Sequence, residues 1–109
     1  MATKSFWIAH IDTGGGLTVR LSGELDMAGA EEVRRFIDTT LARAYSAVAF
    51  DCRGVTFIDS IGVKALIHLA QRCAEMGVEP TFRMNARIDR VMTAMGLSSL
   101  GELVARVAG

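Results

Sequence analysis

The chain has 109 residues with 12 basic and 12 acidic side chains, so its formal net charge at pH 7 is zero. This length suits one domain with one core, and a composition of 50% hydrophobic and 22% charged residues excludes a disordered or low-complexity chain. Zero net charge argues against broad electrostatic attraction to nucleic acid or an anionic membrane. We therefore expect residues 1–109 to form a single domain without a direct nucleic-acid partner.

The cysteine and histidine pattern indicates the compartment and argues against a metal site. Cys52 and Cys73 form neither a CxxC motif nor a disulfide framework, and together with His10 and His68 they show no metal-ligand spacing. The N-terminus lacks the apolar segment of a signal peptide, and no apolar run approaches the roughly 20 residues that span a bilayer. We expect a cytoplasmic protein with reduced thiols, no membrane insertion, no metal and no other cofactor.

The N-terminal part of the chain predicts a β-hairpin followed by a helix. Residues 5–11 and 17–22 alternate apolar and polar side chains, as strands do, and the glycines at 14–16 allow a tight turn. No Gly-Lys pair follows these glycines, which argues against a phosphate-binding loop. A helical period then begins at Met27 and runs to about Ala44. Its apolar face consists of Val33, Phe36, Ile37, Thr40, Leu41 and Ala44.

The next part predicts a buried strand and a second helix. Residues 46–52 form an apolar run typical of a strand covered on both faces. Arg53 and Gly54 break this run, and residues 55–58 are predicted to be a short connector. A helix follows over residues 60–76 and ends before Gly77. Its core stripe is Val63, Leu66, Ile67, Ala70 and Cys73, and a second apolar line is Ile61, Ala65 and Leu69.

The C-terminal part completes an alternating pattern. A strand over residues 78–84 contains Pro80, which predicts an edge strand or one that starts late. Asn85 is expected to cap a third helix that ends at Gly96, and residues 97–107 are expected to form a short C-terminal helix. Strands that alternate with helices predict an α/β domain: a mostly parallel, mixed sheet with an N-terminal hairpin and helices packed against it.

Asp59 and Ser60 lie where the predicted connector meets the second helix. In open α/β folds, loops at the carboxyl ends of strands are where ligands and partners usually bind, and a helix N-terminus favours an anion at Ser60. The alternative is that Asp59 or Ser60 only caps the helix, a common use of both residue types. Asp26, before the first helix, is likewise a candidate N-cap. For Asp59 and Ser60 there are thus two interpretations, a ligand or partner site and a cap. The residues alone leave both open.

Two motifs resemble the signatures of one family. Residues 55–63, Val-Thr-Phe-Ile-Asp-Ser-Ile-Gly-Val, resemble the phosphorylation-site signature of the anti-sigma-factor antagonists, the STAS domain. Residues 23–26, Gly-Glu-Leu-Asp, match that family's second hallmark between the second strand and the first helix. A helix and a strand separate the two motifs, as the family requires, and the resemblance spans nearly the whole chain.

The resemblance implies a partner-switching regulator of transcription in a stress response. In the family, a serine/threonine protein kinase that is also an anti-sigma factor phosphorylates the serine that corresponds to Ser60, and a phosphatase resets it. The unphosphorylated form binds the kinase and frees the sigma factor. The partner surface that the resemblance implies consists of Asp26, Asp59, Ser60, Ile61, Gly62 and Lys64.

Two positions depart from the family pattern. Ile61 stands where a small residue is common, and it either narrows access for a kinase or offers an apolar contact. Lys64 stands where glycine is frequent, one helical turn from Ser60, which suits it to pair with a phosphate. Both departures leave the phosphoacceptor serine in place and leave the identity of the partner open.

Other functional classes receive less support from the sequence. Ser60 is not in a Gly-x-Ser-x-Gly elbow, and His68 lies roughly 12 Å along the same predicted helix, too far to act as its base; we expect no enzymatic activity. The alternative function is a STAS accessory or scaffold subunit of a membrane transport or signalling complex, in which Ser60 is not phosphorylated in the working cycle. Arg83, Arg87 and Arg90 form a basic strip that we interpret as a solvated face rather than a nucleic-acid site.

Overall fold

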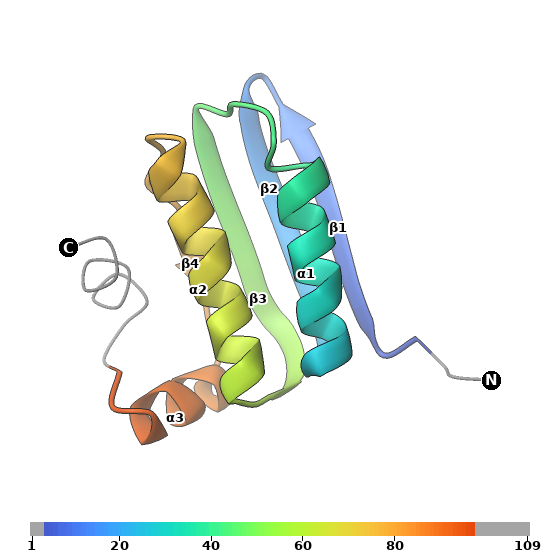
Figure 1. The fold of residues 1–109 in the computed structure, drawn as a ribbon, viewed down its shortest axis with the longest axis vertical. Helices are drawn as coiled ribbons and strands as arrows, with labels where there is room; N and C mark the ends of the chain where they lie inside the picture. The colour runs from blue at the N-terminus through green and yellow to red at the C-terminus, as the bar shows by residue number, and fades with distance from the viewer. Residues whose placement is uncertain (1–3, 98–109) are drawn as a thin grey trace.

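The computed structural model describes residues 4–97 and shows strands and helices alternating after an N-terminal hairpin (Figure 1). The strands are β1 (Phe6–Thr13), β2 (Gly16–Leu25), β3 (Ala47–Ile58) and β4 (Thr81–Arg83), and the helices are α1 (Met27–Thr39), α2 (Ser60–Glu75) and α3 (Ala86–Ala94). The helix expected over residues 97–107 lies, apart from Leu97, outside the described residues.

The four strands form one mixed sheet in the order β1-β2-β3-β4. β1 pairs with β2 antiparallel, whereas β2–β3 and β3–β4 are parallel. Gly14 and Gly15 connect the hairpin with φ angles of 57° and 93°, which only glycine adopts readily in a two-residue turn. The predicted hairpin and the mostly parallel sheet are confirmed.

Strand β3 continues through the break that the sequence predicted. Relative to β2 it has one extra residue between Asp51 and Gly54 and a second between Val55 and Phe57, so each is a β-bulge. The expectation that residues 55–58 form a connector was therefore wrong, because the bulges interrupt the alternation without ending the pairing. The buried side chains change spacing from two to three residues along this strand: Val48, Phe50, Cys52, Val55 and Ile58.

Helix α1 ends at Thr39, although the pattern predicted a helix to residue 44. The N–H of Leu41 donates to the carbonyl of Phe36 at 3.2 Å, one residue farther back than in an α-helix, so the chain turns away here. Nε of Arg72 in α2 donates to the Leu41 carbonyl at 2.9 Å and holds this turn. The apolar pattern of the sequence continues past the end of α1 because Leu41, although it lies in a turn, is also buried in the core.

The predicted ends of the second and third helices and the late start of the edge strand are confirmed, whereas β1 and β2 run past the predicted ends at residues 11 and 22. Gly77 follows α2 with φ 74°, and Gly96 follows α3 with φ 78°. β4 is a short edge strand that begins directly after Pro80. Asn85 caps α3 by accepting a hydrogen bond from the N–H of Ile88 at 2.9 Å.

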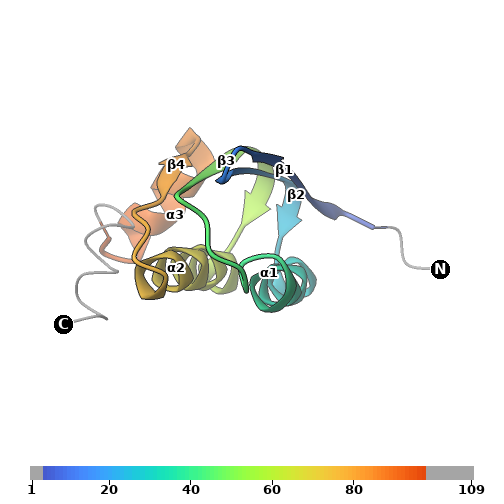
Figure 2. The same cartoon turned by 90° about the horizontal axis from the view of Figure 1, so that it is seen from above.

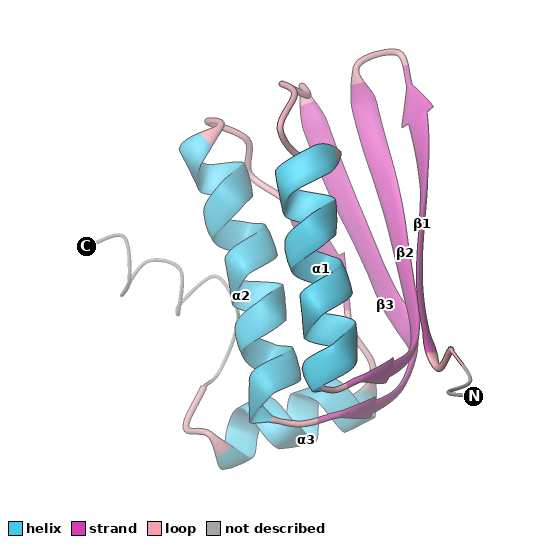
Figure 3. Cartoon of the chain, turned by 45° about the vertical axis from the view of Figure 1, so that its right-hand side comes forward, coloured by secondary structure: helices cyan, strands magenta, loops and turns pink. Residues whose placement is uncertain are grey.

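The two long helices pack on the same face of the sheet. Figure 2 shows α1 and α2 below the strands, and Figure 3 shows them side by side, while α3 lies beside the last part of β3. Ala65 and Leu69 are buried, so the second apolar line of α2 packs inside and only Ile61 is exposed. Fully buried side chains between the sheet and these helices include Val19, Leu21, Leu25, Val33, Phe50, Val63, Leu66 and Leu69.

Candidate functional site

The carboxyl ends of β2 and β3 bring the two sequence motifs together. These strands are parallel neighbours, and Leu25 at the end of β2 is paired with Ile58 at the end of β3. Asp26 and Asp59 each follow one of these paired residues, and each precedes a helix, α1 or α2. Both helices begin at this end of the sheet (Figures 1 and 3). The structure thus places Asp26 beside the Asp59–Ser60 junction.

Both aspartates are N-caps. Oδ1 of Asp26 accepts a hydrogen bond from the N–H of Gly29 at 3.1 Å, and Oδ1 of Asp59 accepts one from the N–H of Gly62 at 2.9 Å. The capping interpretation is confirmed for both aspartates, and Ser60 is the first helical residue rather than the cap. Each carboxylate also lies at the positive end of a helix dipole.

Gly62 lets α2 approach the end of β2 closely. A Cβ at this position would overlap the carbonyl oxygen of Leu25 and lie 2.7 Å from Cγ1 of Ile58. Gly62 is buried, so its contribution to the site is to position Ser60 and Ile61. Gly29 has the same role in α1, where an added Cβ would lie 2.9 Å from the carbonyl oxygen of Glu24. Two small residues therefore set how the two helix N-termini sit on the sheet.

Ser60 is exposed on the outer side of the first turn of α2, as is Lys64 one turn later. Three apolar side chains around this edge are also exposed: Met27 by 67%, Phe57 by 46% and Ile61 by 38%. We refer to Met27, Phe57 and Ile61 as the apolar rim. Ile61 was expected from the sequence, whereas Met27 and Phe57 were missed. The bulges in β3 turn Phe57 outward, and no local sequence signal shows this.

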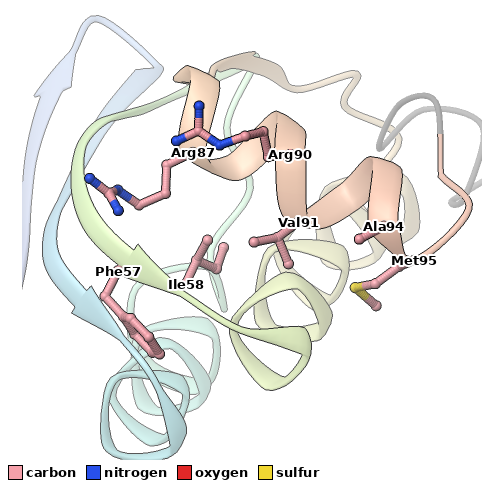
Figure 4. A pocket seen from close by; sticks show the side chains of 7 residues that line it. All are labelled: Phe57, Ile58, Arg87, Arg90, Val91, Ala94 and Met95. Carbon is pink, nitrogen blue, oxygen red and sulfur yellow. The ribbon is translucent and has the colours of Figure 1, made fainter.

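A shallow groove of about 410 Å³ lies next to this edge, between α3 and the end of β3 (Figure 4). Its lining combines Phe57 and Ile58 of β3 with Arg87, Arg90, Val91, Ala94 and Met95. Ile58 connects the groove to the start of α2, two residues before Ser60. The exposed edge of the sheet is therefore apolar around Ser60 and basic toward α3.

The nucleophilic side chains of the core are inert. Burial raises the pKa of the Cys52 thiol to about 12 and that of the Cys73 thiol to about 11, so both are protonated at neutral pH. Among residues 4–97 no three His, Cys, Asp or Glu side chains group in a way that could hold a metal ion. None of the helices in this part of the chain has the length and apolar character needed to cross a membrane.

Comparison with known families identifies the class of protein. The family model of the STAS domain matches residues 8–108, and the chain therefore belongs to the STAS domain family. The fold that the resemblance implied is confirmed: a four-stranded mixed sheet with helices packed against it. No curated protein matches the chain.

Solved structures share this fold. An anti-sigma factor antagonist from Mycobacterium paratuberculosis is similar with a TM-score of 0.68 and 24% identity, over 96% of this chain and 96% of that one. The anti-sigma factor antagonist SpoIIAA in its unphosphorylated form is similar with a TM-score of 0.66 and 23% identity, over 96% of this chain and 97% of that one. SLC26A9 is similar with a TM-score of 0.66 and 15% identity, over 85% of this chain but only 20% of that one.

Proposed function

We propose that this protein is an anti-sigma-factor antagonist that works by partner switching in the cytoplasm. It is a binding protein rather than an enzyme. In its unphosphorylated form it binds an anti-sigma-factor serine kinase through the surface around Ser60, and the sigma factor is released. Phosphorylation of Ser60 abolishes this binding, and a phosphatase restores it. The result is a change in transcription, such as a stress response.

The observation that carries this proposal is the environment of Ser60. Ser60 is exposed at the first turn of α2, within a motif that resembles the phosphorylation-site signature of the anti-sigma-factor antagonists. Asp59 takes the capping role, which leaves the serine hydroxyl available to a kinase. The first-turn N–H groups and the helix dipole favour a phosphate at this position.

The apolar rim supports a protein partner at this edge. Large apolar side chains exposed next to each other mark interaction surfaces more often than single ones do. Asp26, Asp59 and Lys64 surround Ser60 on the same edge and supply polar contacts at the margin of this surface, whereas Ile61 belongs to its apolar part. Protein–protein interfaces usually combine apolar contacts at the centre with polar contacts around them.

The test is phosphorylation by the anti-sigma-factor kinase of the same organism. With ATP, we expect one phosphate, mapped to Ser60 by fragmentation mass spectrometry. Ser60→Ala should remove it, whereas Ser46→Ala, at an exposed serine distant from the helix N-termini, should leave it unchanged. Phosphate that persists at another site in the Ser60→Ala protein would contradict the proposal.

The similarity to part of SLC26A9 favours a second candidate function, a STAS accessory or scaffold subunit of a membrane transport or signalling complex. In that role Ser60 is not phosphorylated in the working cycle. Affinity purification of the chain from cells distinguishes the two functions. A kinase with a sigma factor supports the first, and a membrane complex whose binding does not change in Ser60→Asp supports the second.

A further inference from the structure

Two rows of side chains cross all four strands on the sheet face opposite α1 and α2. Cross-strand pairing defines their members: Ala9, Arg20, Asp51 and Arg83 in one row, and Ile11, Thr18, Ala49 and Thr81 in the next. Their neighbours along the strands, such as Val19 and Phe50, point into the core. Three small side chains of the second row, Thr18, Ala49 and Thr81, leave a hollow of about 280 Å³ beside Asp51 and Arg83.

The first row has more positive than negative charge. Asp51 is already engaged, because Nε and Nη2 of Arg53 donate to its two carboxylate oxygens at 2.9 and 3.0 Å. Arg20 and Arg83 are the strand neighbours of Asp51 on either side, and neither forms an ion pair with any residue of the described part of the chain. One carboxylate thus faces three guanidinium groups.

Helix α3 extends this positive surface. Arg87 and Arg90 line the groove beside β3, and the Arg87 side chain reaches over that strand in Figure 4. Neither has an ion-pair partner among residues 4–97.

Two large apolar side chains, Trp7 and Ile11, lie on β1 at the other side of the same sheet face and are 49% and 65% exposed. We refer to Arg20, Arg53, Arg83, Arg87 and Arg90 as the arginine face.

We propose that the arginine face is a docking surface for an acidic protein segment that also carries apolar side chains. Guanidinium groups bind carboxylates with two parallel hydrogen bonds, which gives both strength and orientation. The hollow between Thr18 and Thr81 accepts a side chain of the segment beside Arg83, and Trp7 and Ile11 offer apolar contacts. Arg20, Arg83 and the hollow lie along the middle of the sheet face, away from Ser60, although the groove lined by Arg87 and Arg90 borders the Ser60 edge. Binding on the sheet face therefore goes beyond the proposed switch.

The charge pattern argues against other occupants. In a two-fold stack of two copies on this face, two surfaces of net positive charge would oppose each other, which is repulsive. A nucleic acid has a regular row of phosphates, and Asp51 lies between Arg20 and Arg83 where such a row would pass. The chain as a whole also has zero net charge, which removes the long-range attraction that phosphate binding uses.

The experiment measures binding of a short fluorescein-labelled peptide of glutamate and leucine by fluorescence anisotropy. Arg83→Glu should weaken binding by about fivefold or more, because it replaces an attraction by a repulsion. Arg35→Glu makes the same charge change on the exposed side of α1 and should alter the affinity by less than about twofold. Melting temperatures of both variants establish that they are folded.

Amide chemical shifts locate the bound peptide. We expect the shifted amides to include Thr18, Ala49 and Asp51, with the same pattern in Ser60→Ala, so the result is independent of the proposed switch. Absence of saturable peptide binding, or equal weakening in Arg83→Glu and Arg35→Glu, would overturn the proposal. Tighter binding of a single-stranded oligonucleotide than of the peptide would overturn it in favour of a nucleic-acid surface.

Discussion

The Cα of Gly62 lies against the carbonyl oxygen of Leu25, so the start of α2 touches the end of β2 with no space for a side chain between them. This contact brings together the two motifs, residues 23–26 and residues 55–63, which are far apart in the sequence. Leu25 immediately precedes the cap of α1, and Gly62 donates its N–H to the cap of α2. The position of Ser60 relative to the end of β2 therefore depends on this close backbone approach.

Gly62→Ala should destabilise the domain by about 2–3 kcal/mol, because the added Cβ overlaps both Leu25 and Ile58 and α2 has to move. Gly16→Ala is the matched control. Its added Cβ would lie 3.3 Å from the nearest atom, the carbonyl oxygen of Thr13, and a small shift relieves this contact. Urea denaturation of both variants gives the comparison. Equal free energies of unfolding for Gly62→Ala and the wild type would show that the approach is not needed.

Asn85 links α3 to the bulged part of β3. Its Oδ1 accepts from the N–H of Ile88, while its Nδ2 donates to the carbonyl oxygens of Val55 at 2.9 Å and Arg53 at 3.2 Å. Asparagine and aspartate are equally good caps, so Asn85→Asp keeps the cap but removes the donor and places a carboxylate against carbonyl oxygens. We expect it to lower the free energy of unfolding by about 2 kcal/mol.

Asp26→Asn is the control for this substitution, since Asp26 only accepts a hydrogen bond, from the N–H of Gly29. It should change stability by less than about 1 kcal/mol. A thermal or urea melt of each variant at neutral pH measures the difference. If Asp26→Asn costs as much as Asn85→Asp, the contacts between Asn85 and β3 contribute nothing beyond the cap.

The helix caps and the class of sheet follow from the sequence, whereas the register and the bulges of the strands do not. The caps at Asp26, Asp59 and Asn85 depend on bonds to a residue three positions away, so their type and place are readable from the chain. The exposure of Phe57 depends on bulges that only the pairing of β3 with β2 defines. The rows of the arginine face likewise depend on strand order and register. The sequence therefore predicts the helix caps, including the one next to Ser60, but not the exposed surfaces around them.

Asp51 gives the stability a pH dependence. The hydrogen bonds from Arg53 are the largest cause that lowers the pKa of Asp51 from 3.8 to about 2. A lowered carboxyl pKa stabilises the folded state fully above the unfolded value, and this contribution is lost as the pH falls from about 4 to about 2. The shift corresponds to about 2 kcal/mol, which we reduce to about 1 kcal/mol because Arg53 is 57% exposed.

Asp51→Asn should therefore be about 1 kcal/mol less stable than the wild type at pH 7, and the two should converge toward pH 2. Urea denaturation at several pH values between 7 and 2.5 tests this. As a control, Asp38→Asn, at an exposed position of α1, should differ from the wild type by less than Asp51→Asn does at pH 7. A constant difference at every pH would mean that the charge of Asp51 is not the cause.

Phosphorylation of Ser60 should change binding through local charge and not through refolding. A phosphoserine carries about −1.5 to −2 charges at pH 7. At the first turn of α2 the dipole and N–H groups favour that charge, so the fold is kept and its stability changes little. In a kinase interface shaped for a neutral hydroxyl, the same charge has to be desolvated beside the carboxylate of Asp59, which costs several kcal/mol.

Ser60→Ala should accordingly bind the kinase constitutively and Ser60→Asp weakly, while their melting temperatures remain nearly equal. Calorimetric titration of both variants against the kinase measures the two affinities. Lys64, exposed one turn after Ser60, should pair with the phosphate, so Lys64→Ala should narrow the stability difference between the phosphorylated and unphosphorylated forms. Equal kinase affinities of the two variants would refute the charge switch. A negative charge at the N-terminus of a folded helix is stabilising, so a large drop in the melting temperature of Ser60→Asp would indicate refolding instead.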